Sequence, residues 1–193
     1  MILDLFLYFA KFPLFAGVKR IATKGDSPLT EYQDLLQQLE QLQEHSLIPA
    51  IENYIYGQSF DDLKSRLDRI AGSFLFVDYG EMTTSSDKTQ SMQVGERIAI
   101  TVAMKLGSTN DALEQAIASD RTLQMLTTIY AKLLADIEKG DFEYAGRSAV
   151  GTSEIIPFVS SELGSYGWSL MLTVTAPDAL GIHEKFKSFM RQG

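Results

Sequence analysis

The sequence contains no cysteine and only two histidines among its 193 residues. Without cysteine the chain can form no disulfide, no thiolate nucleophile and no cysteine-ligated zinc site. His45 follows a predicted helix and His183 lies in a predicted C-terminal helix, and neither has a second ligand at the HExxH spacing. These shortages exclude several catalytic and metal-binding chemistries, and the absence of cysteine fits a reducing cytoplasm.

Positive charge is also scarce, because 25 acidic residues against 17 lysines and arginines give a net charge of −8. A general nucleic-acid binder needs a basic surface to neutralise phosphates, so we expect no stable sequence-specific binding of nucleic acid. No stretch reaches the roughly 18–20 uncharged apolar residues of a membrane span. We therefore expect a soluble protein that needs neither a membrane nor a cofactor.

The first 22 residues are strongly apolar and are divided by Pro13. They resemble a secretion signal only superficially, because no basic region precedes the apolar run and because Asp4 and Lys11 interrupt it. We predict an apolar N-terminal arm, residues 1–26, followed by a single domain, residues 27–193. The arm could cover its own core as a strand or a helix, or it could be buried on a neighbouring molecule.

A helix is predicted from Leu29 to about Glu44, with Ser27 as its N-cap and Pro28 in its first turn. Its apolar side chains recur at spacings of three, four and three residues and form a stripe of Tyr32, Leu35, Leu39 and Leu42. Two heptads are too few for a coiled coil, so the pattern favours a helix laid on a sheet. The stripe is also a candidate interaction surface.

Short helices and β-hairpins are predicted to alternate from residue 59 onward. A capping box at 59–62 opens a helix whose Leu63, Leu67 and Ile70 share one side, and Gly72 closes it. Asn110 or Thr109 is predicted to cap a long helix, which has a possible division at Ser119-Asp120 and ends near Gly140. Residues 46–56 fit either a short strand or a helical turn, 140–152 form a predicted loop, and an amphipathic tail helix is predicted at 180–190.

Strands are predicted at 74–84 and 94–106, and again at 154–161 and 167–176. Alternation is clearest in 94–106, and Pro157 restricts the third strand to an edge or a bulge. We predict an α+β fold, with a mixed or antiparallel sheet of two β-hairpins and helices packed on one face. The first hairpin ends in a polar, mobile tip whose candidate interaction residues are Thr84, Ser85, Ser86, Asp87, Lys88 and Thr89.

No group of residues in the sequence has the spacing of a catalytic site. Asp78 and Glu81 are the best pair of acids, but their odd spacing places them on opposite faces of a regular strand. The phosphate-binding patterns GxGxxG and GxxxxGKS/T are both absent. We predict that the protein is not an enzyme. The alternative is a small hydrolase or ligand-binding protein that uses Asp78, Glu81, Glu96 or His45.

The order helix, hairpin, helix, hairpin runs through SFDDLKSRLDRI, FLFVDYGEM, QVGERIAITVAMKL, ALEQAIASDRTLQMLTTIYAKLLADI, EIIPFVSSEL and GWSLMLTVTAPD. Over residues 59–177, about three-fifths of its length, the chain resembles the tail-terminator and tail-completion proteins of long-tailed bacteriophages. The resemblance implies rings, usually hexameric, that cap the tail tube and join it to the head. It implies no catalytic residues. The apolar arm and the leucine-rich helix at 29–44 exceed the family's minimal pattern.

The resemblance and the missing catalytic pattern together predict a phage or prophage structural protein that forms a ring at the tail end or head–tail junction. Its expected partners are copies of itself and the tail-tube or head-completion proteins, in the virion or the host cytoplasm. Unpaired strand edges of a small sheet could be paired between subunits of such a ring. The alternative is a cytoplasmic adaptor that dimerises through the helix at 29–44.

Overall fold

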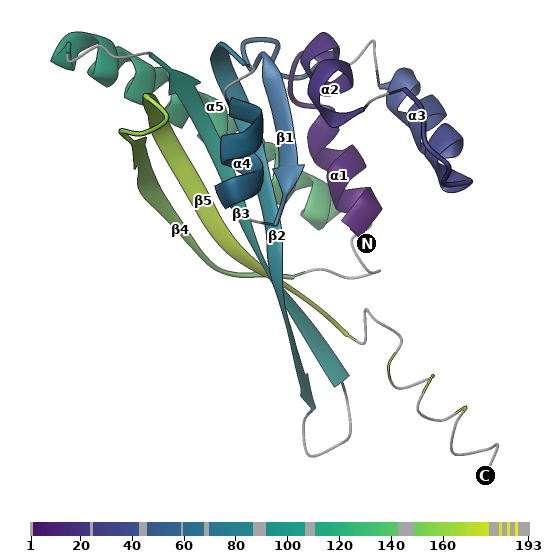
Figure 1. The fold of residues 1–193 in the computed structure, drawn as a ribbon. Helices are drawn as coiled ribbons and strands as arrows, with labels where there is room; N and C mark the ends of the chain where they lie inside the picture. Colours follow the sequence, from purple (N-terminus) through teal and green to yellow (C-terminus); the bar gives the residue numbers. More distant parts are fainter. Residues whose placement is uncertain are drawn as a thin grey trace.

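The computed structural model confirms an α+β fold built on one five-stranded sheet (Figure 1). The structure describes residues 2–23, 25–42, 46–58, 60–67, 70–86, 92–106, 111–142 and 149–177, with Ile182, Lys185 and Ser188. The elements are α1 (Ile2–Ala10), α2 (Phe15–Ala22), α3 (Glu31–Gln41), β1 (Asn53–Gly57), α4 (Phe60–Leu67), β2 (Gly72–Ser86), β3 (Met92–Lys105), α5 (Ala112–Lys139), β4 (Ala149–Ser160) and β5 (Ser165–Pro177).

The two predicted hairpins form most of the sheet, whose strand order is β1-β2-β3-β5-β4. The pairs β2–β3, β3–β5 and β5–β4 are antiparallel, whereas β1 lies parallel to β2 after the crossover through α4. For residues 46–56 the sequence left a short strand and a helical turn open, because Pro49 and a run of only five extended residues give a weak strand signal. The structure has the strand β1 there. The predicted loop at 140–152 is wrong at its end, because β4 already begins at Ala149.

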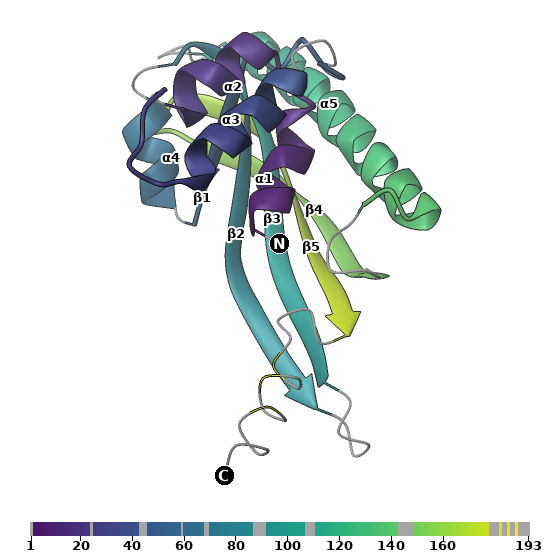
Figure 2. The ribbon, with the colours of Figure 1, turned by 90° about the vertical axis from the view of Figure 1, so that its right-hand side faces the viewer.

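Helices cover the two faces of the sheet unequally. Leu75, Ile100 and Leu170 belong to the main core cluster, on the face beneath α1 and α5. Phe74 and Phe76 point to the other face and pack with Leu63 of α4. Figure 2 shows the sheet between α5 on one side and the shorter α4 on the other. Most of the helical mass lies on one face as predicted, and α4 is the exception.

The long helix α5 is continuous over 28 residues, without a division at Ser119-Asp120. Its N-cap is Asp111, whose carboxylate accepts hydrogen bonds from the backbone N–H groups of Leu113 (2.8 Å) and Glu114 (3.3 Å). The predicted caps Asn110 and Thr109 are therefore one or two residues early. Gly140 ends the helix in the left-handed conformation, at φ 78°, as its position predicted.

Two helix boundaries differ from their predictions. α3 begins at Glu31 because the Ser27 hydroxyl accepts its bond from the N–H of Leu29 (3.2 Å), in the turn before the helix. α4 ends at Leu67, and Gly72, at φ 76°, opens β2 instead of closing the helix. Both errors are shifts of a few residues at element ends, where competing turns differ little in free energy.

The N-terminal arm packs on its own subunit. Pro13 separates α1 from α2, as predicted, and the side chains of Leu5, Phe9 and Val18 are fully buried in the main core cluster. Residues 2–22 thus belong to the same core as the sheet and α5. Burial of three large apolar side chains stabilises this attachment by roughly 5 kcal/mol or more.

Candidate assembly surfaces

The β2–β3 hairpin projects beyond the helical body of the molecule (Figure 1, Figure 2). β1 ends opposite Asp78, so the remainder of β2 pairs with β3 alone. The register shifts between Asp78 and Glu81, an irregularity that bends a strand pair. Glu81 and Arg97 form an exposed cross-strand ion pair at 3.1 Å, which contributes little stability by itself. The hairpin is therefore held mainly by its backbone ladder.

The predicted interaction tip lies at the end of this hairpin. Thr84 and Ser85 are exposed and pair with Val94 and Gln93, so the strands continue past their predicted ends. Ser86 is the last residue of β2. Asp87, Lys88 and Thr89 lie outside the described residues. The described part of the tip is polar and protrudes, with side chains open to solvent.

The β4 edge is the second surface, and it is open and apolar. β4 pairs with β5 on one side, and no strand of the described residues pairs with its other side. Ile155, Ile156 and Val159 are 37%, 38% and 62% exposed. Pro157, which removes one backbone donor, predicted an edge strand or a bulged one, and β4 is an edge strand with a register shift between Val150 and Ser153. Its remaining backbone groups can pair with another strand.

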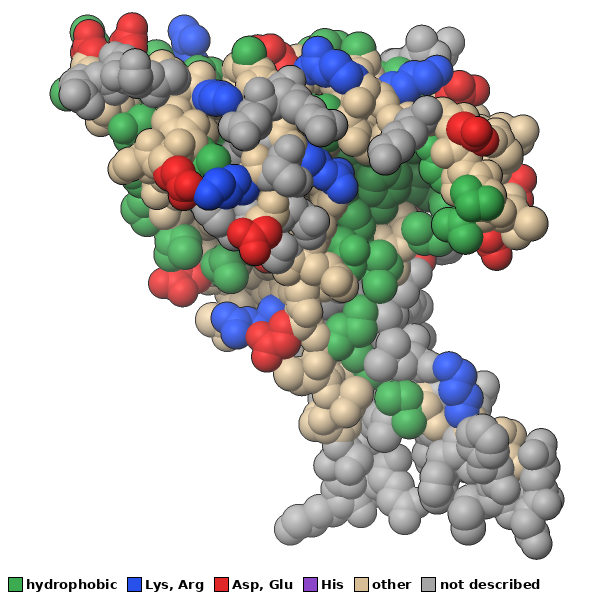
Figure 3. All heavy atoms as spheres, viewed as in Figure 1, with side chains coloured by type: hydrophobic (Ala, Val, Ile, Leu, Met, Phe, Trp, Pro, Cys, Tyr) green, Lys and Arg blue, Asp and Glu red, His purple; other side chains and the backbone are tan. Residues whose placement is uncertain are grey.

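The groove between α1 and α3 is the third surface, and we call it the α1–α3 groove. Its cavity measures about 260 Å³. Figure 3 shows an apolar hollow between the lobe formed by α3 and the rest of the molecule. The wall on α3 includes Tyr32, Leu35, Leu36 and Leu39, and the opposite side includes Ile2, Leu3, Phe6, Tyr56 and Tyr79.

The predicted stripe on α3 thus faces its own subunit. Leu39 is only 4% exposed, Tyr32 and Leu35 are half-buried, and Leu42 packs against the main core. The stripe covers α1 and α2 rather than the sheet, contrary to the simplest expectation. A dimerising adaptor would need this side of the helix free, and no observation in the described residues favours that alternative.

Aromatic rings form the floor of the α1–α3 groove. Tyr56 stacks on Tyr79 with ring centroids 4.4 Å apart, and Phe6 meets Tyr56 edge-on at 5.2 Å. The Tyr56 hydroxyl donates a hydrogen bond to the carbonyl oxygen of Ile2 at 2.6 Å. These contacts fix the first turn of α1 against β1 and β2, so the groove is preformed.

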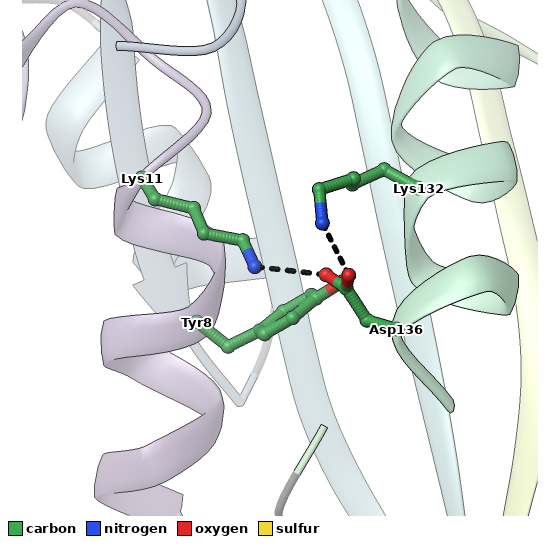
Figure 4. Close-up of polar contacts among 4 residues, drawn as sticks. All are labelled: Tyr8, Lys11, Lys132 and Asp136. Carbon is green, nitrogen blue, oxygen red and sulfur yellow. Dashed lines mark hydrogen bonds and ion pairs between the residues drawn. The ribbon is translucent and has the colours of Figure 1, made fainter. Parts of the chain in front are cut away.

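A buried carboxylate on α5 joins the N-terminal arm to the body of the protein (Figure 4). Asp136 is 1% exposed. It accepts hydrogen bonds from the Tyr8 hydroxyl (2.9 Å) and the Lys11 ammonium (3.1 Å), and it pairs with Lys132 on its own helix. Lys11 also lies 3.6 Å from the centre of the Tyr8 ring, a cation–π contact. We call these four residues the Asp136 cluster.

The protonation equilibria follow from this geometry. Burial alone would raise the pKa of Asp136, but hydrogen bonds from Lys132, Lys11 and Tyr8 outweigh it and lower the pKa to about 2. Burial, and then the contact with Asp136, raises the pKa of Tyr8. Burial also lowers the pKa of Lys11, against the opposing effect of Asp136. The lowered pKa keeps the Asp136 carboxylate ionised at neutral pH, in contact with the side chains of Lys11, Lys132 and Tyr8.

The sequence contained a signal for this cluster that the predictions did not use. Asp136 occupies a buried position of α5, three residues after Leu133 and seven after Ile129. Lys11 interrupts an apolar run. A charge inside each apolar pattern indicates that the two charges meet, because an unpaired buried charge is strongly unfavourable.

The acids that were weighed for catalysis do not converge on a common site. Glu81 is exposed and pairs with Arg97, whereas Asp78 is half-buried on the other side of the register shift. His45 and the side chain of Glu96 lie outside the described residues. Among the residues that the structure describes, no three Asp, Glu or His side chains gather closely enough to hold a metal ion.

No known protein family matches the sequence, and no curated protein is similar to it. Within the described ranges, none of the helices combines the length and apolarity that crossing a bilayer requires.

The three surfaces, which are the β2–β3 hairpin, the β4 edge and the α1–α3 groove, suit contacts between macromolecules. Each offers backbone groups or apolar side chains over an extended area.

Proposed function

We propose that this protein is a non-enzymatic structural subunit that assembles with copies of itself into a ring, and that the ring lies at the tail end or head–tail junction of a phage or prophage. The open β4 edge carries the proposal. Unpaired strand edges join readily to other strands, and soluble proteins that remain monomeric usually protect them. Here Ile155, Ile156 and Val159 stand exposed along that edge.

The order of elements supports the same function. From α4 to β5 the chain runs helix, hairpin, helix, hairpin, the order on which the resemblance to tail-terminator and tail-completion proteins rests. The β2–β3 hairpin projects beyond the body (Figure 1), as expected of an element that contacts a neighbouring subunit or lines a ring lumen. An interface between two different patches of identical subunits forms a ring when its rotation closes.

The charge of the protein is consistent with a position at the tail end or head–tail junction. A net charge of −8 disfavours retention of DNA, because a negatively charged protein repels phosphates. The partners in this proposal are further copies of the chain and the tail-tube or head-completion proteins, in the virion or the host cytoplasm. No catalytic residue and no cofactor has a part in it.

Native mass spectrometry of the full chain, supported by light scattering over a range of concentrations, tests self-assembly. We expect an oligomer of defined mass for the wild type and monomers for a variant with Ile156→Lys and Val159→Lys, because charge on an edge strand opposes pairing. Leu29→Lys is the matched control, since Leu29 is an exposed apolar residue (65%) in the turn before α3, outside the sheet.

The control should assemble like the wild type. A wild-type protein that remains monomeric at high concentration and does not bind isolated tail tubes would contradict the proposal. Assembly that survives the double substitution would place the interface elsewhere on the subunit and remove the role of the β4 edge.

A further inference from the structure

The subunit carries a second open strand edge, on the projecting part of β2. β1 pairs with β2 only as far as Asp78, and beyond it no strand of the described residues pairs with that side of β2. From Glu81 to Ser86, β2 pairs with β3 alone. The backbone groups on the other side of this stretch can therefore pair with a further strand. We call residues 81–86 the outer β2 edge.

The outer β2 edge lacks the features by which soluble proteins usually protect an exposed edge, which are lysine, proline and charge along the strand. After Glu81 it has no charged residue and no proline. Thr83, Thr84 and Ser85 are exposed, and threonine suits an extended strand. The composition of this edge therefore favours pairing with another strand.

The β4 edge matches the outer β2 edge in length and in the placement of charge. The stretch from Glu154 to Val159 has the same number of residues, and each stretch extends roughly 20 Å. In an antiparallel pair that aligns Glu81 with Val159, Glu154 would lie opposite Ser86. No like charges would then face each other, and every other residue in the two stretches is uncharged.

Strand direction favours a contact between these two edges. The strands β2, β3, β5 and β4 alternate in direction across the sheet, so β4 runs opposite to β2. A second subunit placed beside β4 in the same orientation therefore presents its β2 antiparallel to β4. The two edges lie on opposite sides of the sheet, so this contact joins two different patches, the type of interface that forms rings when its rotation closes.

The outer β2 edge is also held away from the rest of its own subunit. β1 ends at Gly57, opposite Asp78, and the register of β2 and β3 shifts between Asp78 and Glu81, an irregularity that bends a strand pair. Both views show the hairpin projecting beyond the helices (Figure 1, Figure 2). This edge is therefore accessible to a neighbour, whereas the part of β2 beside β1 is not.

From these observations we infer that the outer β2 edge of one subunit pairs antiparallel with the β4 edge of the next, so that the sheets of neighbouring subunits are continuous. This pairing rests on the proposed function, because it names the partner of the β4 edge within the ring. Every subunit then donates one strand edge and accepts another, and the repeat of this single contact builds the assembly.

Mixing two blocked variants of the full chain tests this pairing by native mass spectrometry. One variant blocks the outer β2 edge with Thr84→Lys and Ser85→Lys, and the other blocks the β4 edge with Ile156→Lys and Val159→Lys. We expect each variant alone to be monomeric. An equimolar mixture should form a one-to-one heterodimer and nothing larger, because only one complementary pair of edges remains. The matched control, Thr127→Lys with Thr128→Lys on the exposed face of α5, should assemble like the wild type.

The outcomes separate this pairing from the proposed ring. If the wild type assembles and the Thr84, Ser85 variant assembles equally well, the pairing is overturned and the ring proposal stands. Dimers of the Thr84, Ser85 variant alone would also overturn it, because β4 would then pair with β4 of a second copy. A mixture that contains only monomers would overturn it too, whereas a monomeric wild type would contradict the ring as well.

Cysteine cross-linking tests the same contact without added charge, because the natural sequence has no cysteine. Thr84→Cys with Ile156→Cys should give a ladder of linked multimers under mild oxidation, or with a short bismaleimide that tolerates a displaced register. The ladder should form several-fold faster than for the control, Thr127→Cys with Ile156→Cys. Absence of a ladder with both reagents would overturn the pairing even if the lysine variants failed to fold. Equally fast dimers of Ile156→Cys alone would overturn it as well.

Discussion

The two edges of the sheet are protected to very different degrees. β1 is short and buried: the backbone of α2 lies against it, Asn53 and Tyr54 are fully buried, and the Arg20 guanidinium donates a hydrogen bond to the Asn53 side chain. β4 has 12 residues and exposes Ile155, Ile156 and Val159 to solvent. One sheet thus combines a closed edge with an open one.

The closed edge, formed by β1, is covered by hydrogen bonds and close backbone packing within the subunit. The Asn53 side-chain amide donates to the carbonyl oxygens of Ala71 and Ser73, each at 2.9 Å, so the polar groups beside β1 are satisfied within the subunit. Gly17 lets α2 approach the carbonyl oxygen of Glu52. A strand edge protected in this way cannot pair with another molecule, and association through the sheet is directed to β4.

The largest expected effect on the closed β1 edge is that of Gly17→Ala. A Cβ at Gly17 would lie 1.8 Å from the carbonyl oxygen of Glu52, so α2 must move away from β1. We expect a loss of about 3 kcal/mol in the free energy of unfolding, measured by chemical denaturation. The control is Gly151→Ala in β4, where the added Cβ would be 3.4 Å from the carbonyl oxygen of Thr173, an ordinary contact.

Gly151→Ala should change the free energy of unfolding by less than about 1 kcal/mol. Equal destabilisation by both substitutions would show that the two edges are packed alike. Increased aggregation of the Gly17 variant alone would be consistent with the exposure of a second strand edge.

A smaller effect is expected for Asp136→Asn, which weakens the attachment of α1 and, with it, the cover of the closed edge. The amide keeps the size of the carboxylate but loses the charge that holds Lys11 and Lys132. We expect a loss of about 2 kcal/mol in the free energy of unfolding at pH 7. Denaturant titrations from pH 7 to pH 2 check both this value and its pH dependence.

The sign of that dependence follows from the lowered pKa of Asp136, about 2 in the folded protein. The ionised carboxylate stabilises the fold fully above its unfolded pKa, near 4, and this contribution is lost as the pH falls toward 2. The difference between wild type and Asp136→Asn should therefore shrink over this range. A difference that stays constant from pH 7 to pH 2 would contradict an ionic role for Asp136.

The fold was predictable where a pattern repeats over many residues. The alternation predicted the strands β3 and β5, and the apolar residues Ile98, Ile100 and Leu172 on one face of them are buried. The helical period identified α5 and its end at Gly140. β1 was not predictable, because a strand of five residues has too few alternations and its parallel partner lies beyond a helix.

The candidate surfaces were predictable only in part, because local patterns identify an element but not the element that it contacts. Pro157 correctly marked an edge strand, because proline removes a ladder hydrogen bond. The stripe on α3 was correctly identified as apolar, but a sequence pattern does not state which element the stripe faces. The Asp136 cluster joins residues 125 positions apart, and local patterns contain no such distance.

The role of proline at the open β4 edge can be tested with Pro157→Thr, which is expected to have the smallest effect on folding. Threonine restores a backbone donor at the centre of β4 and suits an exposed strand, so the free energy of unfolding should change by less than about 1 kcal/mol. Association should nevertheless increase, because an edge without proline pairs more readily. Sedimentation velocity over a concentration series would measure larger species in the variant than in the wild type.

Thr127→Val on the exposed face of α5 is the control, since it changes a surface residue without altering any strand edge. If Pro157→Thr left the size distribution unchanged, proline would not limit pairing at this edge, and the exposed side chains of β4 would be its main determinant.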